Sequence, residues 1–510
     1  MTLLRRMSLC AGLLLALTQC QIAQPLPEEF GFHERPCWFF AASAQETRCG
    51  WLVVAENRTR SESRKIHLPV VIFPAREQGS EAPPLLYITG GPGGRARIGN
   101  RGEIEGWLRR IEWLPPQRDV IVLGLRGTGR TGPDLDCPEM TDPRIWAGAG
   151  SDPREREAKE RTLIAATVAC RDKLRAEGVD LTAYNSREAA ADIAELRRSL
   201  GIESWSLYGI SYGSRIALAV LRDHPQGVSS VVLDSVVPPE ASRLLELARF
   251  FEAAMNRLFS DCRRSEVCRK AHPDLEAKFD ALVTRLAAEP VELSLPSGRF
   301  WPSLRVTMDH TVLLAVFFEA LYRWDLTERL PAAIAQASAG DFAPMKPLAV
   351  HYFHQVNPRS FSPPVYLSFR CHEEENFVPT EARLEAIRKA GRFGPLIEDD
   401  LDHLLCPHWP AGQADDVEDQ RVVSKIPALL LTGSYDPITP PVFARGAAEG
   451  LASSHVVEFA NVGHGVLGSH PCASEVVAAF FADPVKPPRP ACLGEIQPPD
   501  FSGREDDPRR

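Results

Sequence analysis

The sequence feature that constrains the fold most is the stretch LYGISYGSRIAL, residues 207–218, in which Ser211 stands between Gly209 and Gly213. The preceding run SWSLYG has the character of a strand, and SRIALAVLRDHP has the apolar spacing of a helix that ends at a proline. A strand that passes directly into a helix needs a tight turn, and glycines remove side chains that would clash there. The stretch predicts an exposed serine on such a turn, although the pattern alone would also suit an ordinary loop.

Strand and helix patterns alternate on both sides of this turn. Four strand-like runs with Gly or Pro at their ends come first: GWLVVAEN, KIHLPVVIFPA, PPLLYITGGPGG and RDVIVLGLRGTGRTG. The helical pattern SREAAADIAELRRSLGI precedes the turn, and the strand pattern VSSVVLDSVVPP follows it. The alternation resumes at KIPALLLTGSYDPITPP, with a helix in VFARGAAEGL and a strand in SHVVEFAN. This order predicts βαβ units and a mostly parallel central sheet.

The alternation stops between residues 240 and 423, where helical patterns such as ASRLLELARFFEAAMNRLF dominate and PVELSLPSGRFWPSLRV predicts a hairpin. We interpret this segment as an inserted cap. The predicted core then consists of residues 24–239 and 424–495, followed by a flexible tail at 496–510. A chain of 510 residues, 44% of them hydrophobic, is long enough for one large core and an insertion.

Residues 1–23 have the pattern of a secretory signal peptide, with Arg5 and Arg6 before an apolar stretch of about ten residues. The mature protein is therefore expected to be exported, to the periplasm or beyond the cell. Cys20 is a poor candidate for a lipid anchor because Gln19 stands where a small residue is wanted. The formal net charge is -9, so the chain has no excess of basic residues. This argues against a nucleic-acid partner and favours a small molecule or a peptide.

Ten cysteines lie beyond the predicted signal peptide: Cys37, Cys49, Cys137, Cys170, Cys262, Cys268, Cys371, Cys406, Cys472 and Cys492. An even number in an exported chain predicts disulfides, because an oxidising compartment lets them persist. The sequence does not fix their connectivity, but the cysteines form five close successive couples, so we predict pairing between neighbours. No Cys-x-x-Cys spacing is present, and we predict no metal site.

A serine nucleophile needs a base, and the base needs an acid that orients it. When the nucleophile lies on a strand-to-helix turn of a parallel sheet, the acid follows a late strand and the histidine lies in the last loop. Asp436 follows the strand pattern ALLLTGS, and His464 follows HVVEFAN. Ser211, Asp436 and His464 are therefore the candidate catalytic residues.

Three residues compete for the acid and base positions. Asp234 ends the strand pattern SSVVLD and is an alternative acid, although a structural role at the start of the cap connection suits it better. His455 begins a strand pattern, where a structural histidine is expected, and His470 lies beyond the last loop.

Acyl transfer also needs donors at the position where an oxyanion forms. The backbone N–H of Tyr212, directly after the candidate nucleophile, is one candidate. The second is the N–H of Gly91 in the run YITGGPGG, whose glycines let the backbone approach a substrate. A phosphate-binding loop is the alternative for this run, but it lacks a Gly-Lys-Ser/Thr ending, and no cofactor is predicted.

Six motifs in order, GGPGG, LRGTGRTG, the segment around Ser211, VVLDSVVPP, LLLTGSYDPITPP and VGHG, resemble the secreted α/β-hydrolase peptidases of the proline iminopeptidase and tripeptidyl aminopeptidase group. The resemblance covers residues 50–238 and 425–492. It implies the α/β-hydrolase fold, with a mostly parallel central sheet and an inserted, mainly helical cap. Thr89 departs from the pattern, because proline iminopeptidases usually carry His before Gly-Gly-Pro-Gly.

The resemblance implies cleavage at the free N-terminus of a peptide, with acidic groups of the cap holding the substrate ammonium. The segment FRCHEEENF resembles the cap motif of the family and points to Glu373 and Glu374 as substrate-binding residues. A solvated acidic run beside a disulfide is the alternative. At the level of function the alternatives are a carboxylic ester hydrolase (esterase or lipase) and, less favoured, a non-catalytic binding protein on a hydrolase fold. The sequence predicts neither the number of residues released nor the oligomeric state.

Overall fold

The computed structural model describes residues 25–40, 46–77, 79–140, 153–296, 303–355, 361–398, 401–499 and 501. The predicted signal peptide, Cys20 and most of the predicted tail lie outside these ranges. Over the described ranges, no helix combines the length and the apolar character that a membrane crossing requires.

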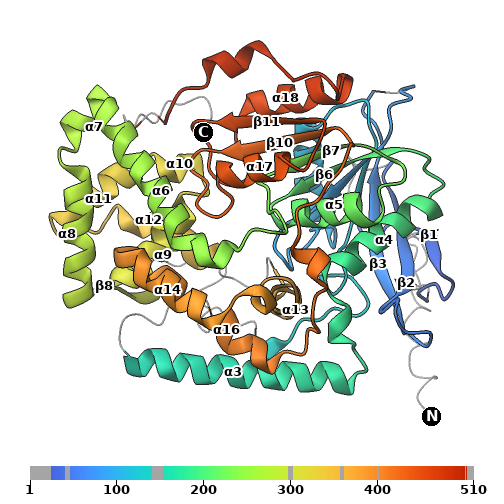
Figure 1. Cartoon of the computed structure of the whole chain (residues 1–510), viewed down its shortest axis with the longest axis horizontal. Coiled ribbons are helices and arrows are strands. Elements are labelled where there is room, and N and C mark those ends of the chain that lie inside the picture. Colours follow the sequence, from blue (N-terminus) through green and yellow to red (C-terminus); the bar gives the residue numbers. More distant parts are fainter. Residues whose placement is uncertain are drawn as a thin grey trace, which may run out of the picture.

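A nine-stranded sheet with the order β1-β2-β3-β5-β4-β6-β7-β10-β11 forms the centre of the molecule (Figure 1). The strands are β1 (Gly31–Arg35), β2 (Arg48–Ala55), β3 (Lys65–Phe73), β4 (Leu85–Ile88), β5 (Val120–Leu123), β6 (Trp205–Ile210), β7 (Val228–Asp234), β10 (Ala428–Gly433) and β11 (Ser454–Phe459). The strands from β5 to β11 in this order pair in parallel, whereas β1, β2 and β3 pair antiparallel at one edge. The predicted mostly parallel sheet is confirmed.

Helices cover both faces of the sheet, which explains why its central strands are apolar along their whole length. On one face, α1 (Arg101–Arg110) and α18 (Pro471–Ala482) bury residues such as Trp107 and Phe480. On the other face lie α4 (Ser186–Ser199), α5 (Tyr212–Asp223) and α17 (Pro441–Ala448), and α3 (Pro153–Ala176), which lies away from the strands, adds side chains to the same core. The sheet therefore separates two apolar cores.

Strand register brings the carboxyl ends of the central strands to one edge of the sheet. Ile88 at the end of β4 pairs with Gly209, and Ile210 pairs with Asp234 at the end of β7. Ligands of open parallel sheets bind outside this edge. The candidate residues that follow β4, β6, β10 and β11 are therefore gathered at one place.

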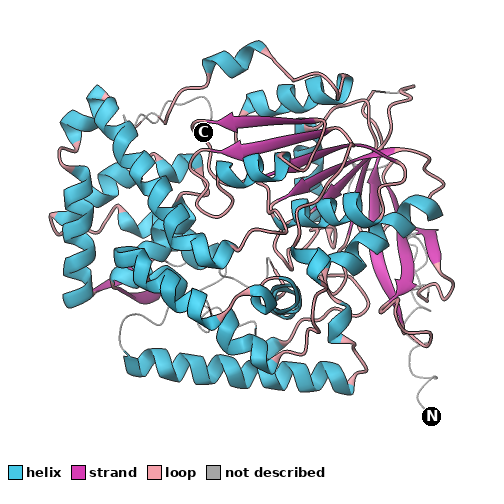
Figure 2. Cartoon of the chain, viewed as in Figure 1, coloured by secondary structure: helices cyan, strands magenta, loops and turns pink. Residues whose placement is uncertain are grey.

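Figure 2 shows the helices of the first part of the insertion gathered beside the sheet, and their buried side chains form a further core. It contains α6 (Arg243–Arg264), α7 (Glu266–Ala271), α8 (Leu275–Ala288), α9 (His310–Ala320), α10 (Trp324–Thr327), α11 (Leu330–Ser338) and α12 (Met345–Gln355). The predicted hairpin is present as β8 (Val291–Leu295) paired antiparallel with β9 (Leu304–Met308).

The second part of the insertion divides between two cores. Helices α14 (Thr380–Ala390) and α15 (Pro395–Glu398) pack on α6, and Ile397 is buried in the core of the first part. In contrast, α13 (Pro363–Glu373) and α16 (Asp402–Leu405) bury residues such as Phe369 and Leu405 in the core on the α5 side of the sheet. Residues 240–423 are therefore not one separate layer, because α13 is packed into the hydrolase core.

All five predicted neighbour disulfides are present in the structure. They are Cys37–Cys49, Cys137–Cys170, Cys262–Cys268, Cys371–Cys406 and Cys472–Cys492. The bond between Cys371 and Cys406 fixes the end of α13 to the segment after α16. This bond links the two segments of the insertion that pack into the core on the α5 side of the sheet.

Candidate active site

Ser211 lies on a tight turn between β6 and α5. Its φ and ψ of 55° and -127° are unusual for a residue other than glycine. The two flanking positions have no room for a side chain. A Cβ at Gly209 would lie 2.5 Å from the Gly213 carbonyl oxygen, and a Cβ at Gly213 would lie 2.3 Å from the Ile88 carbonyl oxygen. The turn places Ser211 at the N-terminus of a 12-residue helix, where negative charge is stabilised.

Asp436 and His464 are in direct contact. His464 Nδ1 lies 2.8 Å from Asp436 Oδ2, and the Asp436 side chain is buried. The backbone N–H groups of Ile438 and Thr439 donate to Asp436 Oδ1 at 3.0 and 2.8 Å. These bonds fix the carboxylate so that it can orient the imidazole.

Thr439 adds a third partner to this pair. Its hydroxyl donates to Asp436 Oδ2 at 2.5 Å and lies 3.1 Å from His464 Nδ1. The motif Asp-Pro-Ile-Thr places the hydroxyl three residues after the acid, within reach of the same carboxylate. Sequence reasoning missed this residue.

The charge of Asp436 controls the basicity of His464. Burial lowers the pKa of His464, but the adjacent Asp436 carboxylate outweighs that effect and holds the pKa above its ordinary value of 6.5. Burial raises the pKa of Asp436, yet the charge and the hydrogen bond of His464 bring it below its ordinary value. The pair is therefore a charged acid beside a histidine that readily accepts a proton.

The loop that carries His464 lies against the turn that carries Ser211. A Cβ at Gly465 would come within 3.1 Å of Ile210 Cδ1, next to the serine. Within the described part of the chain, no hydrogen bond joins Ser211 Oγ to His464. Such bonds are often long before a substrate binds.

Asp234 holds the histidine loop in place and does not contact the imidazole through a hydrogen bond. Its carboxylate accepts hydrogen bonds from the backbone N–H groups of Val466 and Leu467, at 2.8 and 3.0 Å, and from the Tyr208 hydroxyl. It is fully buried, and burial raises its pKa. This position agrees with the structural interpretation of Asp234.

The two alternative histidines make local contacts away from Asp436. His455 Nε2 lies 3.1 Å from the carbonyl oxygen of Val485. His470 is the N-cap of α18, where its Nδ1 accepts the N–H of Cys472. These contacts agree with structural roles for both histidines.

The glycine-rich loop after β4 packs directly on Ser211. A Cβ at Gly90 would lie 2.8 Å from Ser211 Cβ, and Gly91 has a φ of 140° that favours glycine. The first residue of α5 is Tyr212, so its N–H is one of those that a helix leaves unpaired within its own turns. The predicted oxyanion donors, Gly91 and Tyr212, therefore come from the two segments that meet at the serine.

The carboxylate of Glu373 is occupied by the protein itself. It accepts hydrogen bonds from the Tyr212 hydroxyl, from the backbone and side chain of Ser186, and from Arg215 Nε at 2.8 Å. Glu373 is 1% exposed. These contacts favour a structural role for Glu373 over the predicted contact with a substrate ammonium.

Glu374 has a similar position. It is buried and forms an ion pair with Arg370, whose Nε also bonds Asp402 at 2.6 Å. Glu373 and Glu374 thus belong to a buried set of charges on α13 and on the helices that pack against it, α4, α5 and α16. Opposite charges in such a set must stay paired, because an isolated buried charge is costly.

A different cap carboxylate lies beside the candidate histidine. Glu319, at the end of α9, is half-buried and interacts electrostatically with His464. The backbone N–H of His464 donates to the Tyr322 carbonyl at 3.0 Å, and the Tyr322 ring lies 4.7 Å from the imidazole. No side chain of the described residues forms a hydrogen bond or an ion pair with the Glu319 carboxylate. Burial raises its pKa to about 7.

Sequence reasoning missed Glu319 although a signal was present. The run HTVLLAVFFEALYRW carries one acidic residue in an otherwise apolar helix. A carboxylate in that setting is costly unless it has a partner or a function.

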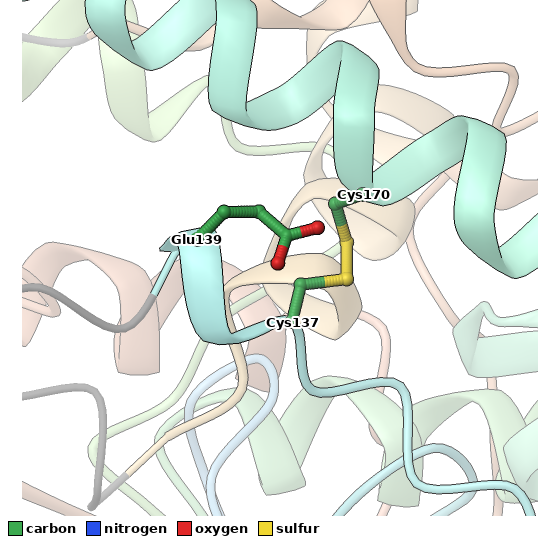
Figure 3. A group of neighbouring side chains, drawn as sticks. All are labelled: Cys137, Glu139 and Cys170. Atoms are coloured by element: carbon green, nitrogen blue, oxygen red, sulfur yellow. A yellow bond between two sulfur atoms is a disulfide. The ribbon is translucent and has the colours of Figure 1, made fainter.

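One group of potential metal ligands occurs in the described part of the chain, made up of Cys137, Glu139 and Cys170. Figure 3 shows that the two sulfur atoms are joined to each other. Disulfide sulfur is not the thiolate that binds a metal. This group is therefore explained by the disulfide.

The geometry at the edge of the sheet supplies a nucleophile, a base and an acid in the chain order of serine hydrolases on parallel sheets. Residues 83–471 match the protein family described as alpha/beta hydrolase fold. The chain belongs to this family and is a serine hydrolase.

Relatives of known type include serine peptidases. The serine protease Hip1 of Mycobacterium tuberculosis (strain ATCC 25618 / H37Rv) is 23% identical over 468 residues, which cover 86% of each protein. A proline iminopeptidase of Arabidopsis thaliana is 31% identical over 221 residues, or 43% of each protein. The predicted resemblance to α/β-hydrolase serine peptidases is confirmed.

Solved structures similar to this chain include an esterase from Exiguobacterium antarcticum. It is 15% identical, covers 83% of this chain and 97% of its own, and has a TM-score of 0.35. A hydrolase from Pseudomonas aeruginosa PA01 is 13% identical, covers 85% and 98%, and has a TM-score of 0.35.

Proposed function

We propose that the protein is an exported serine aminopeptidase that cleaves peptides with a free N-terminus. The observation that carries this proposal is Glu319, a cap carboxylate at the end of α9, just before the Tyr322 that contacts His464; among the described residues it forms no ion pair and no side-chain hydrogen bond. A substrate ammonium would form an ion pair with this carboxylate. A charge-assisted bond of this kind positions an amine well in a partly desolvated site. The peptidase relatives support the same substrate class.

In the proposed mechanism, Ser211 Oγ attacks the peptide carbonyl while His464 takes its proton. Asp436 holds the imidazole and stabilises its positive charge. The N–H groups of Gly91 and Tyr212 stabilise the oxyanion, each contributing about 3 kcal/mol. His464 then gives the proton to the leaving amine. In the second half of the reaction His464 takes a proton from water, which attacks the acyl group, and returns the proton to Ser211 Oγ as the acyl group is released.

Export is supported by two features. Residues 1–23 have the pattern of a signal peptide, and five disulfides persist best in an oxidising compartment. N-terminal sequencing of the protein from cell fractions tests this part of the proposal. A mature chain that begins near residue 24 in an exported fraction is the expected result, and an intact N-terminus in the cytoplasm contradicts it.

The activity is tested with aminoacyl, dipeptidyl and tripeptidyl chromogenic amides, each with a free and an acetylated N-terminus, and with simple esters. We expect cleavage of the free amides and strongly reduced cleavage of the acetylated ones. Equal rates on free and acetylated substrates, or cleavage of esters alone, contradict the proposal and favour the ester hydrolase. Ser211→Ala should abolish turnover while the thermal unfolding midpoint stays close to that of the native protein.

The role of Glu319 is tested by Glu319→Gln, which keeps the shape and removes the charge. We expect KM for free-amine substrates to rise about 10-fold or more, because a hydrogen bond to a charged group contributes about 1.5 to 3 kcal/mol. Hydrolysis of an ester without an amine should change little. Glu252→Gln, on the exposed side of α6 in the same insertion, is the matched control. An unchanged KM in Glu319→Gln removes Glu319 from the binding site.

A further inference from the structure

A groove runs from the candidate histidine along α1. A hollow of about 410 Å³ is lined by His464 and Gly465 and by the last residues of α1, Arg109 and Arg110. The same two arginines line a second hollow of about 630 Å³, which extends to Arg97 after the glycine-rich loop. Because the hollows share these residues, they adjoin each other along α1; we call the two together the groove, which reaches the candidate active site at His464.

The charges that line this groove are mostly positive. They belong to four arginines and one glutamate: Arg95, Arg97, Arg109, Arg110 and Glu103. The chain as a whole carries a formal net charge of -9, so a positive groove is a local feature. A groove lined by one sign of charge raises the local concentration of ligands of the opposite sign.

Three of these arginines are exposed and lack an acidic partner. Arg97, Arg109 and Arg110 form no ion pair within the described ranges, whereas Arg95 pairs with Asp136. Arg110 bonds the Tyr87 hydroxyl at 3.2 Å and also lies over an aromatic ring. Arginines that no carboxylate neutralises are suited to bind carboxylates of a ligand.

The chemistry of cleavage decides which part of a substrate reaches this groove. His464 protonates the leaving amine, so the peptide segment attached to that amine must lie beside His464. The groove begins there. We infer that the groove binds the leaving segment of the peptide and selects segments that carry Asp or Glu side chains. This inference rests on the proposed function and adds a preference for acidic residues after the cleaved bond.

The inference is tested with two peptides that have a free N-terminus. Both begin with the same N-terminal residues, chosen to match the chromogenic amide that the protein cleaves best. They differ only at the second to fourth positions after the cleaved bond, Glu-Glu-Glu in one and Gln-Gln-Gln in the other, and both end in an amide. For the native protein we expect kcat/KM to be about 5- to 10-fold higher for the Glu peptide, mainly through KM, as two or three exposed ion pairs would give. The preference should shrink at about 0.5 M salt, because salt screens exposed charges.

Two substitutions, combined and one at a time, assign the preference to the groove. Arg97→Gln with Arg109→Gln should bring the ratio of the two rates close to one, and each single variant should lower it in part. Arg110 is left unchanged because its aromatic contacts support α1. Arg101→Gln is the matched control, since Arg101 is exposed on α1, pairs with Glu105 and does not line the groove. Thermal unfolding checks that the variants are folded.

The outcomes separate this inference from the proposed function. Equal rates on the Glu and Gln peptides in the native protein overturn the inference, and so does a preference that persists in the double variant. If the free chromogenic amides are cleaved while the peptides show no charge preference, the inference fails and the proposed function stands. If the free amides are not cleaved at all, both fail.

Discussion

The hydroxyl of Tyr212 donates a hydrogen bond to the carboxylate of Glu373, which joins the residue after the nucleophile to helix α13 of the insertion. The same carboxylate pairs with Arg215 one turn further along α5. One buried acid thus fixes the first turn of the helix whose N-terminus presents Ser211.

We predict that Glu373→Gln destabilises the protein. The substitution leaves the buried Arg215 without its anionic partner, and breaking a buried ion pair costs about 3 to 5 kcal/mol. Chemical denaturation measures the loss. Tyr212→Phe removes one hydrogen bond and should cost about 1 to 3 kcal/mol. If Glu373 bound the substrate ammonium, Glu373→Gln would instead raise KM without a loss of stability.

Asp436→Asn should mainly lower kcat, whereas Asp234→Asn should mainly lower stability. Asp436→Asn removes the charge beside His464, and we expect kcat to fall by about 10⁴-fold with the fold retained. Asp234→Asn replaces an acceptor of two backbone N–H groups with an amide, so we expect lower stability and a smaller fall in kcat. A larger loss of kcat in Asp234→Asn, at equal stability, would make Asp234 the orienting acid.

Thr439→Val tests the hydroxyl that bridges the acid and the histidine. The variant keeps the shape but removes the donor to Asp436 Oδ2, a bond to a charged group that contributes about 1.5 to 3 kcal/mol. We expect kcat to fall about 10-fold or more. Thr439→Ser retains the hydroxyl and should keep most of the activity. Equal losses in both variants would point to packing of the methyl group as the cause.

The pH dependence of kcat/KM should show a rise whose midpoint lies above 6.5. The neutral imidazole of His464 accepts the serine proton, and Asp436 raises the pKa of His464, so activity is lost as the pH falls through that raised value. Binding of a free amine also needs the ionised form of Glu319, whose pKa is about 7. KM for such substrates should therefore fall as the pH rises through about 7, and Glu319→Gln should remove this effect.

Local chemistry made the core of the site predictable from sequence. The turn at Ser211 needs glycines on both sides for steric reasons, and the acid and the histidine follow strands whose apolar runs are easy to recognise. The disulfides also follow from proximity in the chain, because each bond joins successive cysteines. In these cases the decisive contacts are set by neighbours in sequence or by the order of strands.

The contacts of the insertion could not be predicted in the same way. Glu373 lies in α13 and Glu319 lies in α9. The sequence of neither helix indicates that α13 packs on α5 or that α9 approaches the histidine loop. That choice depends on Arg215, 158 residues away from Glu373, and on the approach of α9 to the last loop. A motif search favours the denser acidic cluster, whereas the structure pairs that cluster with buried arginines.

The hydrogen bond from the His464 backbone to the Tyr322 carbonyl has a consequence for protein engineering. The end of α9 supports the histidine loop, and a Cβ at Gly463 would collide with the Leu321 carbonyl oxygen at 2.0 Å. The insertion therefore cannot be exchanged between relatives as an independent cassette. A chimera that replaces residues 240–423 has to recreate the approach of residues 321 and 322, or its histidine loses part of its support even if the sheet folds correctly.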